Sequence, residues 1–256
     1  IHVGPGRRTR AARLRGAGVS AASRLAYDAW HDRHDVDRDV DTPWHRLLFA
    51  HLDGARDLAG RRVLEIACGR GGLACRLARS MHRPAHLLAA DFSTTAVTKG
   101  RSHAQGAGLR GLRWSVSDLQ ACGIQTGTFD TVISCESIEH LERPRVACEE
   151  FARILRPGGR LYLTTPNYLG PLGLYRAYVR LKGTPYSEGG QPINRFMLLP
   201  RTCAWIRRAG LRIRTVDAVG HYLPWPGRPL RGISSLESWR PLRWFALHSL
   251  VVAEKP

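Results

Sequence analysis

Lysine and long apolar runs are scarce in this chain. Only Lys99, Lys182 and Lys255 are lysines, so 36 of the 39 basic residues are arginines. No apolar stretch approaches the roughly 18 residues that a membrane-spanning helix needs, which excludes such a helix. The basic N-terminus has no apolar segment after it, which excludes a secretory signal peptide. These absences predict a cytoplasmic protein.

Cysteine is present but unpatterned. The six cysteines are at positions 68, 75, 122, 135, 148 and 203, and no two of them form a C-x-x-C pair. Most of them lie inside apolar runs. We therefore expect reduced core residues and exclude zinc ligands or a disulfide framework.

The formal charge of +18 has two interpretations. It can mark a surface for nucleic acid or for an anionic membrane. It can also follow from a GC-rich genome, because arginine, alanine and glycine are all abundant. The arginines are spread along the chain, with one local cluster between Arg7 and Arg15. The pattern favours a solvated basic surface, disfavours a nucleic-acid partner and leaves a peripheral membrane contact open.

The domain organisation follows from length and patterning. A chain of 256 residues with 43% hydrophobic content suits one domain with a sizeable core. Residues 1–22 are rich in Gly, Ala and Arg and predict a flexible basic arm. Residues 23–256 form a single predicted domain, with an N-terminal helical cap over 23–59 and a substrate-side insertion over 167–197. Leu25, Trp30, Leu47 and Leu48 are expected among the anchors of the cap.

Strands and helices alternate after residue 60. Apolar runs lie at 62–67, 86–90, 112–116, 129–135, 159–165, 211–217 and 245–253, and helical patterns lie at 72–80, 94–106, 143–155 and 199–209. Such alternation predicts an α/β fold, a three-layer sandwich with a mostly parallel sheet covered on both faces.

A glycine-rich turn follows the first strand, in the segment Val63 to Gly72. Glycines allow the backbone to approach a ligand closely, because they have no Cβ. Asp91 ends the next apolar run, where a carboxylate can accept hydrogen bonds from both hydroxyls of a ribose. The two features together predict a cofactor that contains adenosine.

The spacing of the turn indicates which cofactor binds. The run is E-x-A-x-G-x-G-G, with Glu65 before the turn, whereas a dinucleotide site uses G-x-G-x-x-G. A carboxylate at this place suits a cationic amino group and repels a pyrophosphate. S-adenosylmethionine carries an ammonium group, a sulfonium and a ribose, and it has no phosphate.

This segment resembles the first motif of class I S-adenosylmethionine-dependent methyltransferases. Ala67 departs from the family pattern at its first glycine. The resemblance implies a Rossmann-like sheet of seven strands, with an antiparallel last strand inserted beside the sixth. It also implies that Asp118 binds the adenine amino group and that Leu119 packs on the base; a turn cap formed by Ser117 and Asp118 is the less favoured alternative. The expected cofactor-binding residues are Glu65, Ala67, Gly69, Gly71, Asp91, Phe92, Asp118, Leu119 and Cys135.

A second motif, E-x-x-E-H, lies within residues 129–141 and contains Glu136, Glu139 and His140. Together with the blocks at 155–159, 163–167 and 181–185 it resembles ubiquinone-biosynthesis O-methyltransferases. The resemblance covers about residues 60–220. The cofactor motif identifies only a superfamily. E-x-x-E-H occurs in fewer methyltransferases, but several groups share it.

His140 is the predicted catalytic residue. An imidazole with a pKa of about 6.5 can take a proton from a hydroxyl as the methyl group is transferred. The alternative is a structural role, in which His140 caps or packs against the following helix. If the turn is helical, Glu136, Glu139 and His140 share one face and can hold a divalent ion such as Mg²⁺. Small-RNA 3′-terminal 2′-O-methyltransferases resemble this pattern but add a histidine where this chain has Asn194, so a metal is possible and not favoured.

The methyl acceptor is the least determined part. The segments 27–31 and 44–45 and the insertion at 167–197 are expected to build its site. In the insertion, Tyr168, Leu172 and Tyr175 belong to an expected apolar side, and Arg176 belongs to a basic side. This pattern fits a lid over a hydrophobic substrate, an interfacial helix or a packed core helix. We expect O-methylation of a small phenolic, sugar or natural-product intermediate; the alternatives are an RNA 2′-O-methyltransferase and an N-methyltransferase acting on a small molecule.

Overall fold

The computed structural model describes residues 18–35, 40–183, 189–223, 231–237 and 239–256. Residues 1–17 of the predicted arm, with their arginine cluster, lie outside the described residues. The remainder of the arm leads directly into a helix that begins at Ala21. None of the helices in the described segments is long and apolar enough to span a bilayer.

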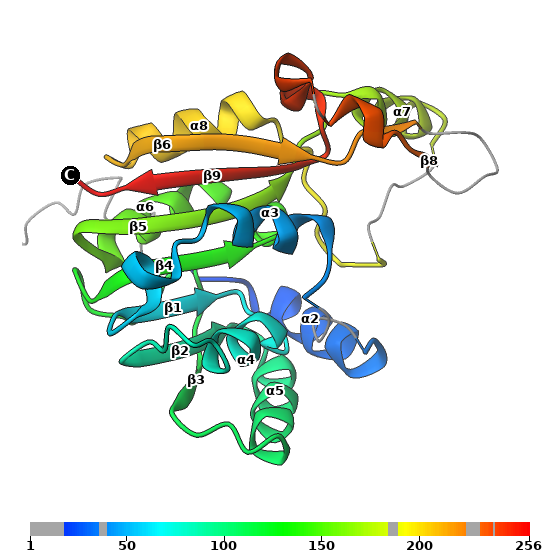
Figure 1. The fold of residues 1–256 in the computed structure, drawn as a ribbon. Coiled ribbons are helices and arrows are strands. Elements are labelled where there is room, and N and C mark those ends of the chain that lie inside the picture. The colour runs from blue at the N-terminus through cyan, green and yellow to red at the C-terminus, as the bar shows by residue number, and fades with distance from the viewer. Residues whose placement is uncertain (1–17, 36–39, 184–188, 224–230, 238) are drawn as a thin grey trace, which may run out of the picture.

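Helices and strands alternate along the chain as the sequence predicts (Figure 1). The helices are α2 (Ala21–Arg33), α3 (Pro43–His51), η1 (Gly54–Leu58), α4 (Gly72–Ala78), α5 (Thr94–Gly106), η2 (Ile138–His140), α6 (Pro144–Ile154), α7 (Pro171–Leu181), α8 (Leu199–Arg208), η3 (Ser234–Leu236) and η4 (Arg240–Phe245). The strands are β1 (Arg62–Ile66), β2 (His86–Asp91), β3 (Leu112–Val116), β4 (Phe129–Cys135), β5 (Leu155–Pro166), β6 (Arg212–Val219), β7 (Tyr222–Leu223), β8 (Arg231–Gly232) and β9 (His248–Glu254).

Seven strands form one sheet in the order β3-β2-β1-β4-β5-β9-β6. β9 runs antiparallel to both of its neighbours, and the other pairs are parallel. This arrangement confirms the predicted three-layer α/β fold with an antiparallel last strand beside the sixth. Because β9 is antiparallel, it begins at the edge of the sheet where β4 and β5 end.

The two faces of the sheet build two separate cores. Leu64 and Ile66 of β1 pack with Phe151 of α6 and Ile206 of α8 on one face. Val63 packs with the other face, where α3 and α4 supply Leu47, Leu48, Leu73 and Leu77. The alternation of neighbouring β1 residues between faces follows from the two-residue period of a strand. Leu25 is not an anchor as predicted, because it is 70% exposed.

Side-chain caps define where the helices near the site begin. The Thr42 hydroxyl accepts from the backbone N–H of His45, and Pro43 occupies the first turn of α3. The Ser93 hydroxyl accepts from Ala96 N–H at the start of α5 (3.1 Å). Figure 1 shows α2 and α7 at the end of the sheet toward which the parallel strands point.

Candidate active site

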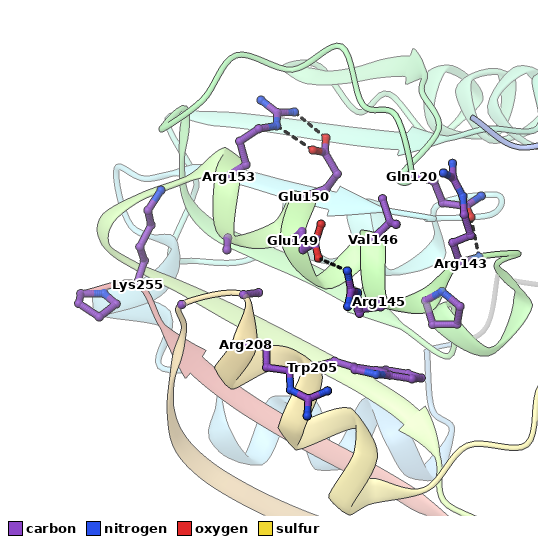
Figure 2. Close-up of a pocket in the computed structure, with 15 residues that line it drawn as sticks. Gln120, Arg143, Arg145, Val146, Glu149, Glu150, Arg153, Trp205, Arg208 and Lys255 are labelled. Atoms are coloured by element: carbon purple, nitrogen blue, oxygen red, sulfur yellow. Dashed lines mark hydrogen bonds and ion pairs between the residues drawn. The ribbon is translucent and has the colours of Figure 1, made fainter. Parts of the chain in front are cut away.

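Two cavities formed by the described residues are considered as a site. The larger, about 920 Å³, lies between α6 and α8 (Figure 2). Its walls carry the ion pairs Arg153–Glu150 and Arg145–Glu149, and no predicted catalytic or cofactor-binding residue lines it. The smaller, about 580 Å³, is lined by the glycine-rich turn, the end of β2 and the turn after β4. We therefore take the smaller cavity as the candidate active site.

Asp91 and the glycine-rich turn are joined at the floor of this cavity. One oxygen of the Asp91 carboxylate accepts from Gly69 N–H (2.9 Å) and the other accepts from Ser93 N–H (2.8 Å). Asp91 is buried, with 4% of its surface exposed, and both Gly69 and Asp91 line the cavity. The hydrogen bonds hold the carboxylate in one orientation at the end of β2, which is the geometry a ribose would need.

Of the other residues predicted to bind the cofactor, Glu65, Ala67, Phe92 and Cys135 also line the cavity. Glu65 is buried at the end of β1, at 4% exposure, so it supplies a carboxylate close to the glycine-rich turn. Burial raises the pKa of the Cys135 thiol strongly, and the nearby Glu65 carboxylate adds to that shift. The Cys135 side chain is therefore a neutral wall of the cavity and no nucleophile.

Ala67 occupies a left-handed backbone conformation, with φ of 55°. The family pattern has glycine here, and glycine adopts this conformation without the cost of about 1–2 kcal/mol that a Cβ imposes. We expect Ala67→Gly to raise the free energy of unfolding by about 0.5–1 kcal/mol, and Ala67→Val to lower it by more than about 1 kcal/mol. Urea unfolding of the three proteins checks this, and equal stability of the Gly and Val variants would contradict it.

Gly71, Asp118 and Leu119 do not line the cavity. Gly71 is the N-cap residue of α4, with φ of 68°, and an added Cβ there would collide with the ring of Trp114, so packing explains this glycine. The Asp118 carboxylate accepts from Gln120 N–H (2.8 Å) and from Val19 N–H. Leu119 is buried in the core. The adenine-binding role of Asp118 and Leu119 therefore stays a prediction.

His140 lines the cavity from the short helix η2. Its Nδ1 lies 2.6 Å from the carbonyl oxygen of Ile193, which can only accept, so Nδ1 carries a proton and donates it. Burial lowers the pKa of His140 below its ordinary 6.5, partly offset by the Ile193 hydrogen bond. At neutral pH the imidazole is therefore uncharged, and Nε2 keeps its lone pair.

Glu139 lies beside Nε2 of His140. The closest carboxylate oxygen is 3.5 Å from that nitrogen, and the second oxygen accepts from the Thr165 hydroxyl at the end of β5 (2.9 Å). The carboxylate is fixed and almost completely buried. It would stabilise a positive charge that forms on the imidazole when Nε2 takes a proton.

Glu136 does not share a helical face with Glu139 and His140. It has a left-handed backbone conformation, with φ of 43°, and η2 begins only at Ile138. Its carboxylate instead lies 3.5 Å from Nδ1 of His248, the first residue of β9. Among the described residues no group of three or more His, Cys, Asp and Glu side chains is placed to hold a metal ion.

His248 is a polar residue of the cavity that the sequence analysis did not predict. It pairs with Pro166 across β5 and β9 and packs against the Trp44 ring, with ring centroids 4.9 Å apart. The sequence indicates this residue only through the expected strand order. An antiparallel last strand begins at the edge where the parallel strands end, so the polar residue that opens that strand belongs to the site.

The N-terminal helices cover the cavity. Tyr27, Trp30 and His31 of α2 and Trp44 and His45 of α3 line it, which places the two predicted acceptor segments there. The indole of Trp30 donates to Gly189 O (2.9 Å). From the described part of the insertion at 167–197, only Gly189 and Gln191 line the cavity. The insertion's helix α7 therefore contributes no residue to the cavity lining, and Arg176 is buried and not part of a basic face.

Hydrogen bonds and ion pairs fasten α2 over the cofactor turn. Asp28 accepts from the Ser93 hydroxyl (2.6 Å) and from Thr95 N–H (3.0 Å) at the start of α5. Lys99 pairs with Asp32 (2.8 Å). These contacts hold α2 against the start of α5, where it forms one wall of the cavity.

Burial of His31 predicts a pH-dependent stability. Burial lowers the His31 pKa from 6.5 to about 4, and the Arg70 guanidinium adds to that shift. Between pH 6.5 and about 4, His31 binds a proton in the unfolded chain but stays unprotonated in the folded chain. Stability is therefore lost as pH falls from about 6.5 through about 4, by roughly 3 kcal/mol in total.

The measurement is urea unfolding at about pH 7.5 and about pH 5. We expect a smaller loss in His31→Gln than in the unchanged protein, because glutamine has no proton to bind in this range. His140 and His221 also have lowered pKa values. The difference between the two proteins isolates His31 from them, and an identical loss would contradict the assignment.

Comparisons with known proteins agree with this geometry. A family model described as a methyltransferase domain matches residues 64–163. The ubiquinone biosynthesis O-methyltransferase of Xanthomonas euvesicatoria pv. vesicatoria is 36% identical over 182 residues, which cover 67% of this chain and 71% of that protein. The protein of the same name from Xylella fastidiosa (strain 9a5c) is 30% identical over 209 residues, 78% of this chain and 79% of that protein.

Solved structures share the fold at low sequence identity. An S-adenosylmethionine-dependent methyltransferase from Mesorhizobium loti matches 84% of this chain and 99% of its own, with a TM-score of 0.59 and 19% identity. The YcgJ protein from Bacillus subtilis matches 82% and 98%, with a TM-score of 0.61 and 18% identity. At these identities the likeness concerns the fold alone.

The sheet order and the cavity beside the glycine-rich turn define a Rossmann-like methyltransferase. The chain belongs to the class I S-adenosylmethionine-dependent methyltransferases and is similar to the ubiquinone-biosynthesis O-methyltransferases. The predicted resemblance, fold and enzyme class are confirmed, and S-adenosylmethionine is the cofactor.

Proposed function

We propose that the enzyme transfers a methyl group to a hydroxyl of a small molecule, with His140 as the proton acceptor. The observation that carries this proposal is the state of the imidazole. Its Nδ1 proton is committed to Ile193 O, its pKa is lowered by burial, and Nε2 is left as an acceptor in the cavity. A hydroxyl needs such a base, because its oxygen must lose a proton as it gains the methyl group.

The residues of this chain supply alignment and proton transfer. The cofactor supplies a methyl group that is already electrophilic. Glu65, Gly69 and Asp91 would hold the cofactor at the ends of β1 and β2, and the turn after β4 brings His140 to the same cavity. Glu139 then stabilises the imidazolium. Holding the two reactants in one reactive geometry lowers the barrier to methyl transfer.

The part of the cavity lined by α2, α3 and the start of β9 suits a flat or hydroxylated small molecule as methyl acceptor. Trp30 and Trp44 give it broad apolar surfaces, and His45 and His248 give it hydrogen-bonding groups. Ligand sites combine such apolar walls with a few fixed polar groups. These side chains support a phenolic, sugar or natural-product intermediate as acceptor, and the name of the relatives supports O-methylation.

A cofactor-turnover screen tests the proposal. Phenols, sugars, amines and short RNAs are offered separately, and S-adenosylhomocysteine formation is measured. We expect turnover with a small hydroxylated compound. Turnover with amines alone would favour the N-methyltransferase. Methylation of the RNA 3′ end, with binding that weakens steeply with salt, would favour the RNA enzyme, since neutralised phosphates give a log-log slope of about −0.7 each on single strands.

A further inference from the structure

The cavity between α6 and α8 lies apart from the methyl-transfer site. Among the described residues, it shares no lining residue with the cavity that contains His140 and the glycine-rich turn. Its volume of about 920 Å³ is within the range of small-molecule sites. Figure 2 shows the residues of α6 and of the segment before it on one wall, and Trp205 and Arg208 of α8 on the other.

Gln120 has a buried donor in the lining of this cavity. The residue is 1% exposed, and its Oε1 accepts from the backbone N–H of Arg143 (2.7 Å). That bond fixes the orientation of the amide, because only its oxygen can accept. The Nε2 group is buried and has no hydrogen-bond acceptor among the described residues. A buried donor without an acceptor is costly, and an acceptor atom of a ligand in the cavity would satisfy it.

The N-terminus of α6 opens on the same cavity. Arg143 is its N-cap residue, and Pro144, Arg145 and Val146 of the first turn also line the cavity. The Arg143 side chain makes no capping hydrogen bond, and the first turn holds no acidic residue. The partial positive charge of this helix end is therefore not neutralised by the helix itself, and anions bind at such ends. The helix end and Gln120 Nε2 thus require the same partner, an anion with several acceptor oxygens.

The charged residues of the lining add to the positive potential. Of the described lining residues, five are basic and two are acidic. Both acidic residues are engaged, because Glu149 pairs with Arg145 (3.4 Å) and Glu150 pairs with Arg153 (2.7 Å). The net charge of the lining is therefore positive, which favours an anionic ligand.

Trp205 supplies an aromatic surface on the opposite wall. Its indole is partly buried against the core, and the Arg201 guanidinium lies over the ring, 5.2 Å from its centroid. The core packing holds the indole in place while it lines the cavity. A ring that is held in this way can stack with a flat group of a ligand.

We propose that the cavity between α6 and α8 binds a small molecule that carries an aromatic ring and a phosphate group. The phosphate accepts hydrogen bonds from Gln120 Nε2 and from the Arg143 guanidinium at the start of α6, and the ring lies against Trp205. A phosphate presents more acceptor oxygens to these donors than a carboxylate does, and a guanidinium matches its geometry.

Calorimetry with phenyl phosphate tests the proposal. The enzyme is first saturated with S-adenosylhomocysteine, so that the probe cannot enter the cofactor site. We expect saturable binding of one phenyl phosphate per chain, and at least tenfold weaker binding of inorganic phosphate, which has no ring. Arg143→Gln and Gln120→Leu should each weaken the binding of phenyl phosphate about tenfold. Arg207→Gln is the matched control, because Arg207 is exposed on α8 but does not line the cavity.

Trp205→Leu separates the ring from the phosphate. This variant should bind phenyl phosphate no more tightly than inorganic phosphate. Unchanged affinity for S-adenosylhomocysteine shows that each variant is folded, and the partly buried Arg143 keeps the test valid if loss of the buried Gln120 prevents folding. The proposal would be overturned if phenyl phosphate did not bind saturably, if Arg143→Gln bound it equally well, or if Arg207→Gln lost as much affinity.

Discussion

Replacing His140 by alanine is expected to lower kcat by about a hundredfold or more, the usual scale for loss of a general base. The affinity for S-adenosylmethionine should change little, because the cofactor residues lie on other elements. His140→Gln is the matched variant, since its amide can still donate a hydrogen bond to Ile193 O but cannot take a proton. Steady-state kinetics and calorimetry separate the two effects.

The pH dependence checks the same residue. The His140 pKa is lowered by burial, so the unprotonated base persists below pH 6.5 and the acid limb of kcat should lie below that value. The limb should disappear in the residual activity of the variants. Full activity in His140→Gln would assign His140 to packing. Activity that vanishes with a chelator and returns with Mg²⁺ would make Glu136 and Glu139 metal ligands.

Replacing Asp91 by alanine is expected to weaken cofactor binding by about 1–3 kcal/mol, a factor of roughly 5 to 150 in Kd. The carboxylate would bind the ribose, and it also fixes the N–H groups of Gly69 and Ser93. Asp91→Asn keeps one acceptor oxygen and should lose less. Calorimetry with S-adenosylmethionine and with S-adenosylhomocysteine measures both variants, and unchanged affinity in Asp91→Ala would contradict the ribose assignment.

Asp130 provides the matched control for this experiment. It is a buried carboxylate at the start of β4, and it accepts from Arg62 N–H and pairs with Arg156. It lies near the amino end of β4, whereas the cavity lies at the carboxyl ends of the parallel strands. Asp130→Ala should therefore lower stability but leave cofactor affinity unchanged, which separates a general loss of structure from a lost ligand contact.

The strands could be predicted because most of them are buried on both faces. A strand in a covered parallel sheet is a short continuous apolar run, and such runs are visible in a single sequence. The glycine-rich turn and Asp91 were predictable for a related reason. Neighbouring parallel strands end on the same side of the sheet, so the residues at their ends lie close together. The backbone N–H of Gly69, after β1, donates to the carboxylate of Asp91, at the end of β2 (2.9 Å).

Contacts between distant segments could not be predicted in this way. Helical spacing placed Arg176 on a basic face, but its partners, the carbonyls of Asn194 and Arg195, come from an irregular segment. Glu136 would share a face with Glu139 and His140 only in a helical turn, whereas its left-handed backbone turns the carboxylate to His248. Neither arrangement leaves a periodic signal, because each depends on how loops fold back on the sheet.

The most direct test of the account follows the methyl group itself. The enzyme is given S-adenosylmethionine with a ¹³C-labelled methyl group and an acceptor found by the turnover screen, and the product is examined by NMR. The account predicts label in a methyl ether of a small molecule, formed by the unchanged enzyme and about a hundredfold more slowly by His140→Ala. Label on nitrogen, carbon or an RNA 3′ end, or an equal rate in both proteins, would contradict it.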